Sequence, residues 1–151
     1  MNDIKLVVGN DISWSQIEFL NNIYKEVLFT NHNASISMPF KENCFDVSYC
    51  SNTLHHMPNK DSVINMFENM FKISKKIIIV EIKNPTKTGG FPYLLNKYWY
   101  TLFLKDVGKH YFDINEFKNI INEVFSNKAI INFDSFKNIM GNYMIAEIIK
   151  K

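Results

Sequence analysis

Hydrophobic residues along the chain fall into two patterns, continuous runs typical of buried strands and stripes at helical spacing. Strands are predicted at Ile4–Val8, Val27–Phe29, Phe45–Cys50, Ile77–Ile82, Ala129–Phe136 and Tyr143–Ile149. Helices are predicted to begin after Ser13, where Gln16 completes a capping box, at Pro58-Asn59, and after Asp113, which forms a second box with Glu116. Their core faces are predicted to be Trp14, Ile17, Leu20, Ile23 and Val27; Val63, Met66, Phe67, Met70 and Phe71; and Phe117, Ile120, Ile121 and Val124.

The order of these elements predicts a single α/β domain over residues 1–151. Strands that alternate with helices form a mostly parallel, Rossmann-like sheet with helices on both faces. The last two strands follow each other around a turn near Gly141-Asn142, so we expect them to form an antiparallel hairpin at the end of the chain.

The composition argues against a nucleic-acid-binding, membrane-spanning or disulfide-rich protein. The net charge of +2 is too small to indicate nucleic-acid binding, and no segment approaches the roughly 20 apolar residues of a membrane-spanning helix. The two cysteines, Cys44 and Cys50, cannot complete a disulfide framework or a metal site, which favours reduced thiols in a cytoplasmic protein. All 17 basic residues are lysines, so any anion is held by lysine or by backbone N–H groups.

Ligands of an open parallel sheet bind at the carboxyl ends of its strands, so the residues that follow each strand are the candidates for a site. Asp11 follows the first strand, and its carboxylate can accept hydrogen bonds from both hydroxyls of a ribose; the alternative is that it helps to cap the next helix. Asn33 and Ala34 follow the second strand, where a side-chain carbonyl and a backbone N–H can read an adenine; the alternative is an ordinary loop.

Two adjacent histidines, His55 and His56, follow the third strand. Neighbouring side chains point in different directions, so both rings cannot face one metal ion, and the spacing of His32 and His110 supplies no third ligand. We therefore expect one ring to pack structurally and the other to border the pocket, where an imidazole can act as a base.

Together these segments resemble the class I S-adenosylmethionine-dependent methyltransferases, especially the small-molecule enzymes akin to the ubiquinone and menaquinone C-methyltransferases. The resemblance runs from about Ile4 to Glu81. The segments that carry it are Val7-Val8-Gly9-Asn10-Asp11-Ile12-Ser13, Asn33-Ala34, Met38-Pro39-Phe40, Phe45-Asp46-Val47, Leu54-His55-His56 and Ile77–Glu81.

The resemblance implies a role for each candidate residue. Asp11 and the neighbouring Ile12 would hold the ribose of S-adenosylmethionine, and Asn33 with Ala34 would hold the adenine. Ser51 and Asn52 would lie against the methionine portion, and His55 and His56 would stand near a small-molecule methyl acceptor. The aromatic segment 84–112 falls where these enzymes place an acceptor-covering lid, which implies a partly apolar acceptor.

One element of the family pattern is absent from the sequence. The family has a first strand that ends in an acid and a glycine-rich turn (Asp/Glu-x-Gly-x-Gly), yet only eight residues precede Gly9. The resemblance therefore implies a partial domain that lacks the usual first strand, with strand Ile4–Val8 either pairing directly with Phe45–Cys50 or leaving a gap. Three interpretations remain open: a gene fragment or mis-called start, a split enzyme completed by a second polypeptide, and a non-catalytic remnant that serves as a binding or scaffold protein. The exposed sheet edges could also lead the chain to self-associate. A nicotinamide-dependent enzyme is disfavoured because it requires the same turn.

Overall fold

The computed structural model describes residues 4–84, 108, 110–138 and 141–151. Their elements in chain order are β1 (Val8–Asp11), α1 (Trp14–Ile23), β2 (Leu28–Asn31), β3 (Phe45–Ser51), the 3-10 helix η1 (Leu54–His56), α2 (Lys60–Ile73), β4 (Ser74–Ile82), α4 (Ile114–Phe125), β5 (Ala129–Asn138) and β6 (Gly141–Lys150). The expected α/β class, with a parallel sheet and a final antiparallel hairpin, is confirmed. The segment 85–107, which makes up most of the expected lid, lies outside the described residues.

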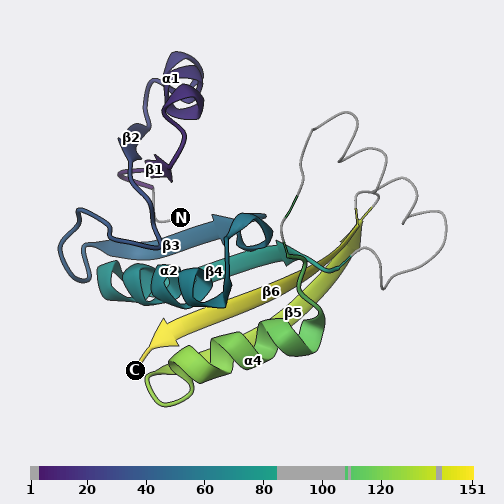
Figure 1. The fold of residues 1–151 in the computed structure, drawn as a ribbon. Coiled ribbons are helices and arrows are strands. Elements are labelled where there is room, and N and C mark those ends of the chain that lie inside the picture. Colours follow the sequence, from purple (N-terminus) through teal and green to yellow (C-terminus); the bar gives the residue numbers. More distant parts are fainter. Residues whose placement is uncertain (1–3, 85–107, 109, 139–140) are drawn as a thin grey trace.

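The strands form two separate sheets (Figure 1). One sheet contains β1 and β2 in parallel, and the other has the order β3-β4-β6-β5, in which β3 and β4 are parallel and β6 is antiparallel to both of its neighbours. Within the described part of the chain, β1 and β3 therefore each pair on one edge only. Of the two expected arrangements for the first strand, the gap is the one observed.

The hydrophobic core lies between the four-stranded sheet and the two helices α2 and α4 (Figure 1). Alternate residues of β4, Ile77 and Ile79, are fully buried beneath these helices because successive side chains of a strand point to opposite faces. The predicted core faces of both helices are buried, except that Phe71 is only partly buried. Both helices also begin where predicted, since Asn59 accepts the Ser62 N–H and Asp113 accepts the Glu116 N–H.

The N-terminal unit, residues 4–31, differs from its prediction. The first strand begins at Val8 rather than Ile4, because only Val8 and the residues after it find Cα partners in β2. In α1 only Ile17 is buried, whereas Trp14 and Ile23 are exposed on a helix expected to bury both. Ser13 makes no capping bond through its side chain, so the predicted capping box with Gln16 is wrong. The pattern correctly predicts a helix, but among the described residues α1 packs mainly on the small sheet, which buries Ile17 and leaves most of the stripe uncovered.

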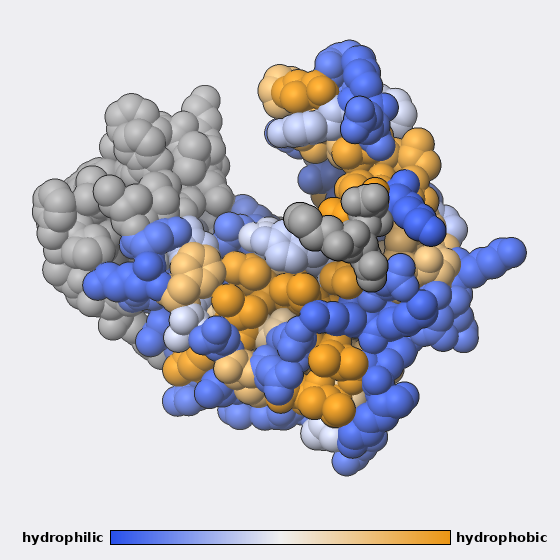
Figure 2. Space-filling view, turned by 180° about the vertical axis from the view of Figure 1, so that it is seen from behind, coloured by the Kyte–Doolittle hydropathy of each residue, from blue (hydrophilic) through white to orange (hydrophobic). Residues whose placement is uncertain are grey.

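The opposite face of the four-stranded sheet is not covered by α2 or α4. Val47 and Tyr49 of β3 and Ile130 of β5 are exposed hydrophobic residues, and Figure 2 shows hydrophobic side chains gathered on the side turned away in Figure 1. Of the helices expected on both faces, α2 and α4 share one face, and α1 belongs to the smaller sheet. Within the described residues, no helix is long and apolar enough to cross a membrane.

The two cysteines are expected to differ strongly in reactivity. Cys44 is exposed, whereas burial raises the pKa of the Cys50 thiol to about 12 from its usual 9.0. Since the thiolate is the reactive form and the Cys50 side chain is buried, Cys50 should react at least about 100-fold more slowly than Cys44 with a thiol reagent at neutral pH. Mass spectrometry after timed alkylation measures this, with Cys44→Ser as the control that leaves only the slow thiol. Equal labelling rates would contradict the packing of β3 described above.

Candidate functional site

Asp11, at the carboxyl end of β1, lies where the sequence analysis places it, and its side chain has a structural contact. Its Oδ1 accepts the Ser13 N–H at 2.7 Å, which caps the start of α1. A carboxylate offers about four lone-pair positions on its two oxygens, so this bond leaves capacity for ribose hydroxyls. The helix-capping and ribose-binding roles are therefore compatible in one side chain. The adjacent Ile12 is exposed.

Asn31, which the sequence analysis did not single out, holds the ends of β1 and β2 together. Its Nδ2 donates to the backbone oxygens of Asp11 and Ile12, both at 2.9 Å. The sequence gives little sign of this role, because an asparagine at the end of a strand can make such bonds only if the right strand lies beside it. Its amide fixes the backbone that carries Asp11.

Asn33 fits its expected role less well than Asp11 does. Its side-chain Oδ1 accepts both the N–H of Ser35, at 3.0 Å, and the hydroxyl of Ser35, at 2.7 Å. An amide oxygen has two lone pairs, so both are occupied in this turn. The backbone oxygen of Ala34 accepts Nδ2 of Asn69 from α2 at 2.8 Å, which anchors the loop after β2 to the main core.

The Ser51–His56 loop, which runs from the last residue of β3 through η1, carries the other four predicted residues, Ser51, Asn52, His55 and His56. Asn52 adopts a left-handed backbone conformation (φ 48°) and donates its N–H to the oxygen of Val80 in β4 at 2.9 Å. The hydroxyl of Thr53 donates to the oxygen of Ser51 at 3.0 Å. The chain thereby turns sharply at the carboxyl end of β3 and continues into η1, with Asn52 exposed.

The two histidines are placed differently. His55 is buried, with 2% of its surface exposed, whereas His56 is exposed. The ring of His55 stacks on Tyr111, with centroids 4.9 Å apart and planes 12° apart, and its Nδ1 lies 2.6 Å from Oε1 of Glu81. An exposed imidazole can reach a ligand and exchange protons with solvent, so His56 is better placed than His55 to act as a base.

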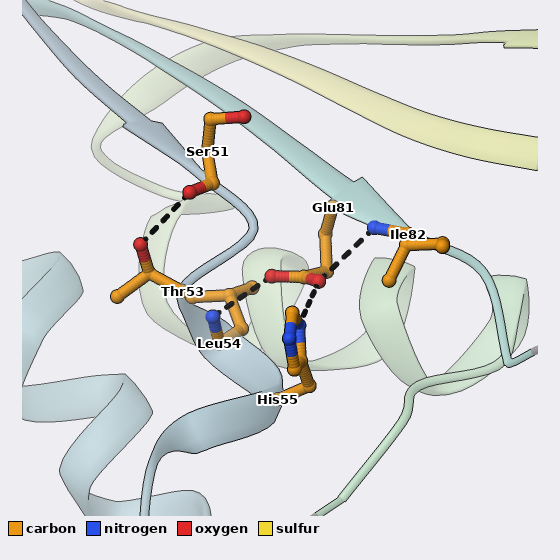
Figure 3. Close-up of polar contacts among 6 residues, drawn as sticks. All are labelled: Ser51, Thr53, Leu54, His55, Glu81 and Ile82. Atoms are coloured by element: carbon orange, nitrogen blue, oxygen red, sulfur yellow. Dashed lines mark hydrogen bonds and ion pairs between the residues drawn. The ribbon is translucent and has the colours of Figure 1, made fainter. Parts of the chain in front are cut away.

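Glu81 is the residue at this site that the sequence analysis missed. It is fully buried at the end of β4, where its Oε2 accepts the Leu54 N–H at 2.8 Å and its Oε1 accepts the Ile82 N–H at 3.0 Å (Figure 3). Its position could have revealed it. Glu81 follows Ile77 and Ile79 on the buried face of an apolar strand, and a charge in such a place requires several hydrogen bonds.

The predicted residues thus form two groups on separate sheets. Asp11 and Ile12 lie at the end of the small sheet and Ser51, Asn52, His55 and His56 at the end of the large one, with Asn33 and Ala34 in the connection between them. In the part of the chain that the structure describes, no three His, Cys, Asp or Glu side chains are grouped so as to hold a metal ion. The arrangement offers hydrogen-bonding and acid–base groups.

Comparison with known proteins identifies the family. The model of a family described as a methyltransferase domain matches residues 1–124. The chain belongs to this methyltransferase-domain family. A search of curated proteins found no match.

Solved structures similar to this methyltransferase domain include S-adenosylmethionine-dependent enzymes. A protein from Thermotoga maritima is 16% identical with a TM-score of 0.65, and the match covers 97% of this chain and 74% of that one. One from Methanosarcina mazei is 16% identical with a TM-score of 0.63, covering 95% and 79%. The magnesium protoporphyrin IX methyltransferase of Synechocystis, with bound S-adenosylhomocysteine, is 15% identical with a TM-score of 0.58, covering 97% and 64%.

These likenesses show a shared fold, and they also show a difference in length. The methyltransferase domain aligns over nearly all of its own residues but spans only 53% to 79% of the solved chains. The solved chains therefore contain additional polypeptide that has no counterpart in the alignment.

Proposed function

We propose that this chain is a large part of a methyltransferase that moves a methyl group from S-adenosylmethionine to a small-molecule acceptor. The match of the methyltransferase-domain family to residues 1–124 carries the proposal. The placement of Asp11, Ser51, Asn52 and His56 at the carboxyl ends of parallel strands supports it. We place the enzyme with the ubiquinone- and menaquinone-methyltransferase-like group, in the cytoplasm.

The residues present fit the cofactor in part. Asp11 retains acceptor capacity for the ribose, and the turn at Asn52 leaves Ser51 and Asn52 at the strand end for the methionine portion. Asn33 would read the adenine amine only if Ser35 released one of its two bonds to Oδ1. The sequence before β1 holds no glycine-rich turn, which in the family is where the backbone approaches the cofactor most closely.

S-adenosylmethionine supplies a methyl group made reactive by its attachment to a positively charged sulfur. A lone pair of an oxygen, nitrogen or carbon nucleophile forms the new bond to the methyl carbon, and the carbon–sulfur bond breaks with its electron pair remaining on sulfur. The nucleophile loses its proton to a base, for which the exposed His56 is the candidate. Most of the acceleration in such a transfer comes from holding the two reactants in line.

The exposed hydrophobic surface of the N-terminal unit supports completion by additional polypeptide. Nine of the fourteen large exposed hydrophobic side chains of the described residues lie in residues 4–28. A two-stranded sheet is marginally stable by itself, and α1 adds only one buried side chain, Ile17, to its packing. Exposed apolar patches of this kind mark interaction sites. A strand that pairs with the free edges of β1 and β3 would cover part of this surface. It can come from a second polypeptide or from self-association.

The alternative function is a non-catalytic methyltransferase-like protein that binds a partner through this same surface. The observation that favours it is the exposed surface itself. The two functions make different predictions: completing the sheet should create a binding site for S-adenosylmethionine in a methyltransferase, but not in a non-catalytic protein.

The test is a chain extended before Met1 by a strand and an Asp/Glu-x-Gly-x-Gly turn. We expect this extended chain to bind S-adenosylmethionine, and the change Asp11→Asn to weaken binding about 10- to 100-fold, because it removes charge-assisted bonds to the ribose. Asparagine still accepts the Ser13 N–H, so α1 should persist. Asp46→Asn, at an exposed aspartate paired with Lys75, is the matched control. A folded extended chain without measurable binding would favour the non-catalytic alternative.

A further inference from the structure

The carboxylate of Glu81 is used entirely as an acceptor. Oε2 faces the Leu54 N–H, and Oε1 faces both the Ile82 N–H and Nδ1 of His55, as Figure 3 shows. An ionised carboxylate only accepts hydrogen bonds, so Nδ1 of His55 is the donor to an ionised Glu81. Three N–H groups from two segments of the chain therefore converge on one buried side chain.

The ring of His55 is held on several sides. It stacks on Tyr111 and contacts His56, with centroids 4.1 Å apart. A Cβ placed on Gly108 would come within 2.6 Å of its Cδ2, so glycine is the residue that fits beside the ring. The backbone oxygen of His55 also accepts the His110 N–H at 3.1 Å. The stacking and the close approach of Gly108 confine the plane of the ring, and a flip of the ring would break the contact between Nδ1 and Glu81.

The bonds to Glu81 have a consequence for the loop that follows β3. Leu54 and His55 are joined to the end of β4 through this carboxylate, and Asn52 is joined to β4 through the oxygen of Val80. The exposed residues Asn52 and His56 lie on either side of the buried pair Leu54 and His55. The position of both exposed residues thus depends on how firmly the buried pair is held.

We infer that Glu81 is the positioning residue of this site: its buried carboxylate holds the Ser51–His56 loop on the end of β4 and keeps His55 protonated at Nδ1. Glu81 itself has no exposed surface, so it acts on the site through the loop that it holds. That the loop serves methyl transfer rests on the proposed function, whereas the attachment of the loop rests on the contacts alone.

The protonation of the histidine ring nitrogens, measured by nitrogen–proton correlation spectra of the labelled full chain at neutral pH, tests this inference. We expect Nδ1 of His55 to carry a proton in the unaltered protein. In Glu81→Gln the side chain has one acceptor oxygen and one NH₂ group, so it cannot accept from Leu54, Ile82 and His55 together. We expect His55 to change to the Nε2-protonated form, and the Asn52 amide to exchange with solvent at least about tenfold faster.

Glu116→Gln is the matched control, because it alters a second histidine–carboxylate pair, which lies at the surface, with Nε2 of His110 2.7 Å from Oε1 of Glu116. It should leave the signals of His55 and the exchange of Asn52 unchanged. A neutral His55 protonated only at Nε2 in the unaltered protein would overturn the inference, whether or not Glu81→Gln folds. So would a folded Glu81→Gln that retains the Nδ1 proton and slow exchange at Asn52. No ligand is present in this test, so its failure is distinct from a failure of cofactor binding.

Discussion

Replacing Phe125 by alanine is expected to lower the free energy of unfolding by about 3–5 kcal/mol, a large share of the stability of a domain of this size. Phe125 is fully buried at the end of α4, and its ring contacts those of Phe67 and Phe71, with centroids 6.0 and 5.1 Å away. Removing it leaves a cavity where α2 and α4 meet. Urea denaturation followed by circular dichroism measures the change.

Phe19→Ala is the matched control for this experiment, because it removes the same ring from an exposed position on α1. We expect it to change the free energy of unfolding by no more than about 0.5 kcal/mol. A loss from Phe19→Ala as large as that from Phe125→Ala would mean that α1 packs against a surface in solution, contrary to the structure.

Hydrogen exchange is expected to divide the chain into two parts. Backbone amides of β4 and β6, which lie in the middle of the four-stranded sheet, should exchange only on global unfolding. Amides of β1 and β2 have one neighbouring strand and a helix with a single buried residue, so they should exchange at least about 1,000-fold faster. Exchange measured by mass spectrometry over short peptides gives both rates.

The result of this exchange experiment bears on the partner as well. Polypeptide that pairs with the free edges of β1 and β3 should slow exchange in β1 and leave β4 unchanged. Equal protection of β1 and β4 in the isolated chain would contradict the division into two sheets.

The sequence predicted best the elements that are determined by neighbouring residues along the chain or by packing in the main core. The stripe from Val63 to Met70 and the cap at Asp113 each carry their own signal, because burial and capping follow from spacing along one helix. Two consecutive hydrophobic runs joined by a short turn likewise predicted the β5–β6 hairpin. The spacing of Trp14 and Ile17 predicted α1 as a helix, but the burial of Trp14 depended on a surface that the described chain does not provide.

The location of the candidate site could be predicted from the sequence, whereas the contacts of its side chains could not. The rule that ligands meet the carboxyl ends of parallel strands located Asp11 and the Ser51–His56 loop. The sequence could not decide which of His55 and His56 is buried, because that depends on the rotation of the short helix η1. It also did not indicate that Ser35 occupies the carbonyl of Asn33, because such a turn is a local contact between two common loop residues.

Calorimetric titration of the 151-residue chain with S-adenosylmethionine tests most directly the claim that the residues proposed to hold the cofactor are divided between two separate sheets. We expect no saturable binding tighter than about 1 mM, because the residues proposed to hold the ribose and those proposed to hold the methionine portion lie on separate sheets. Binding in the low micromolar range would show that these residues already form a complete cofactor pocket, and would contradict the account.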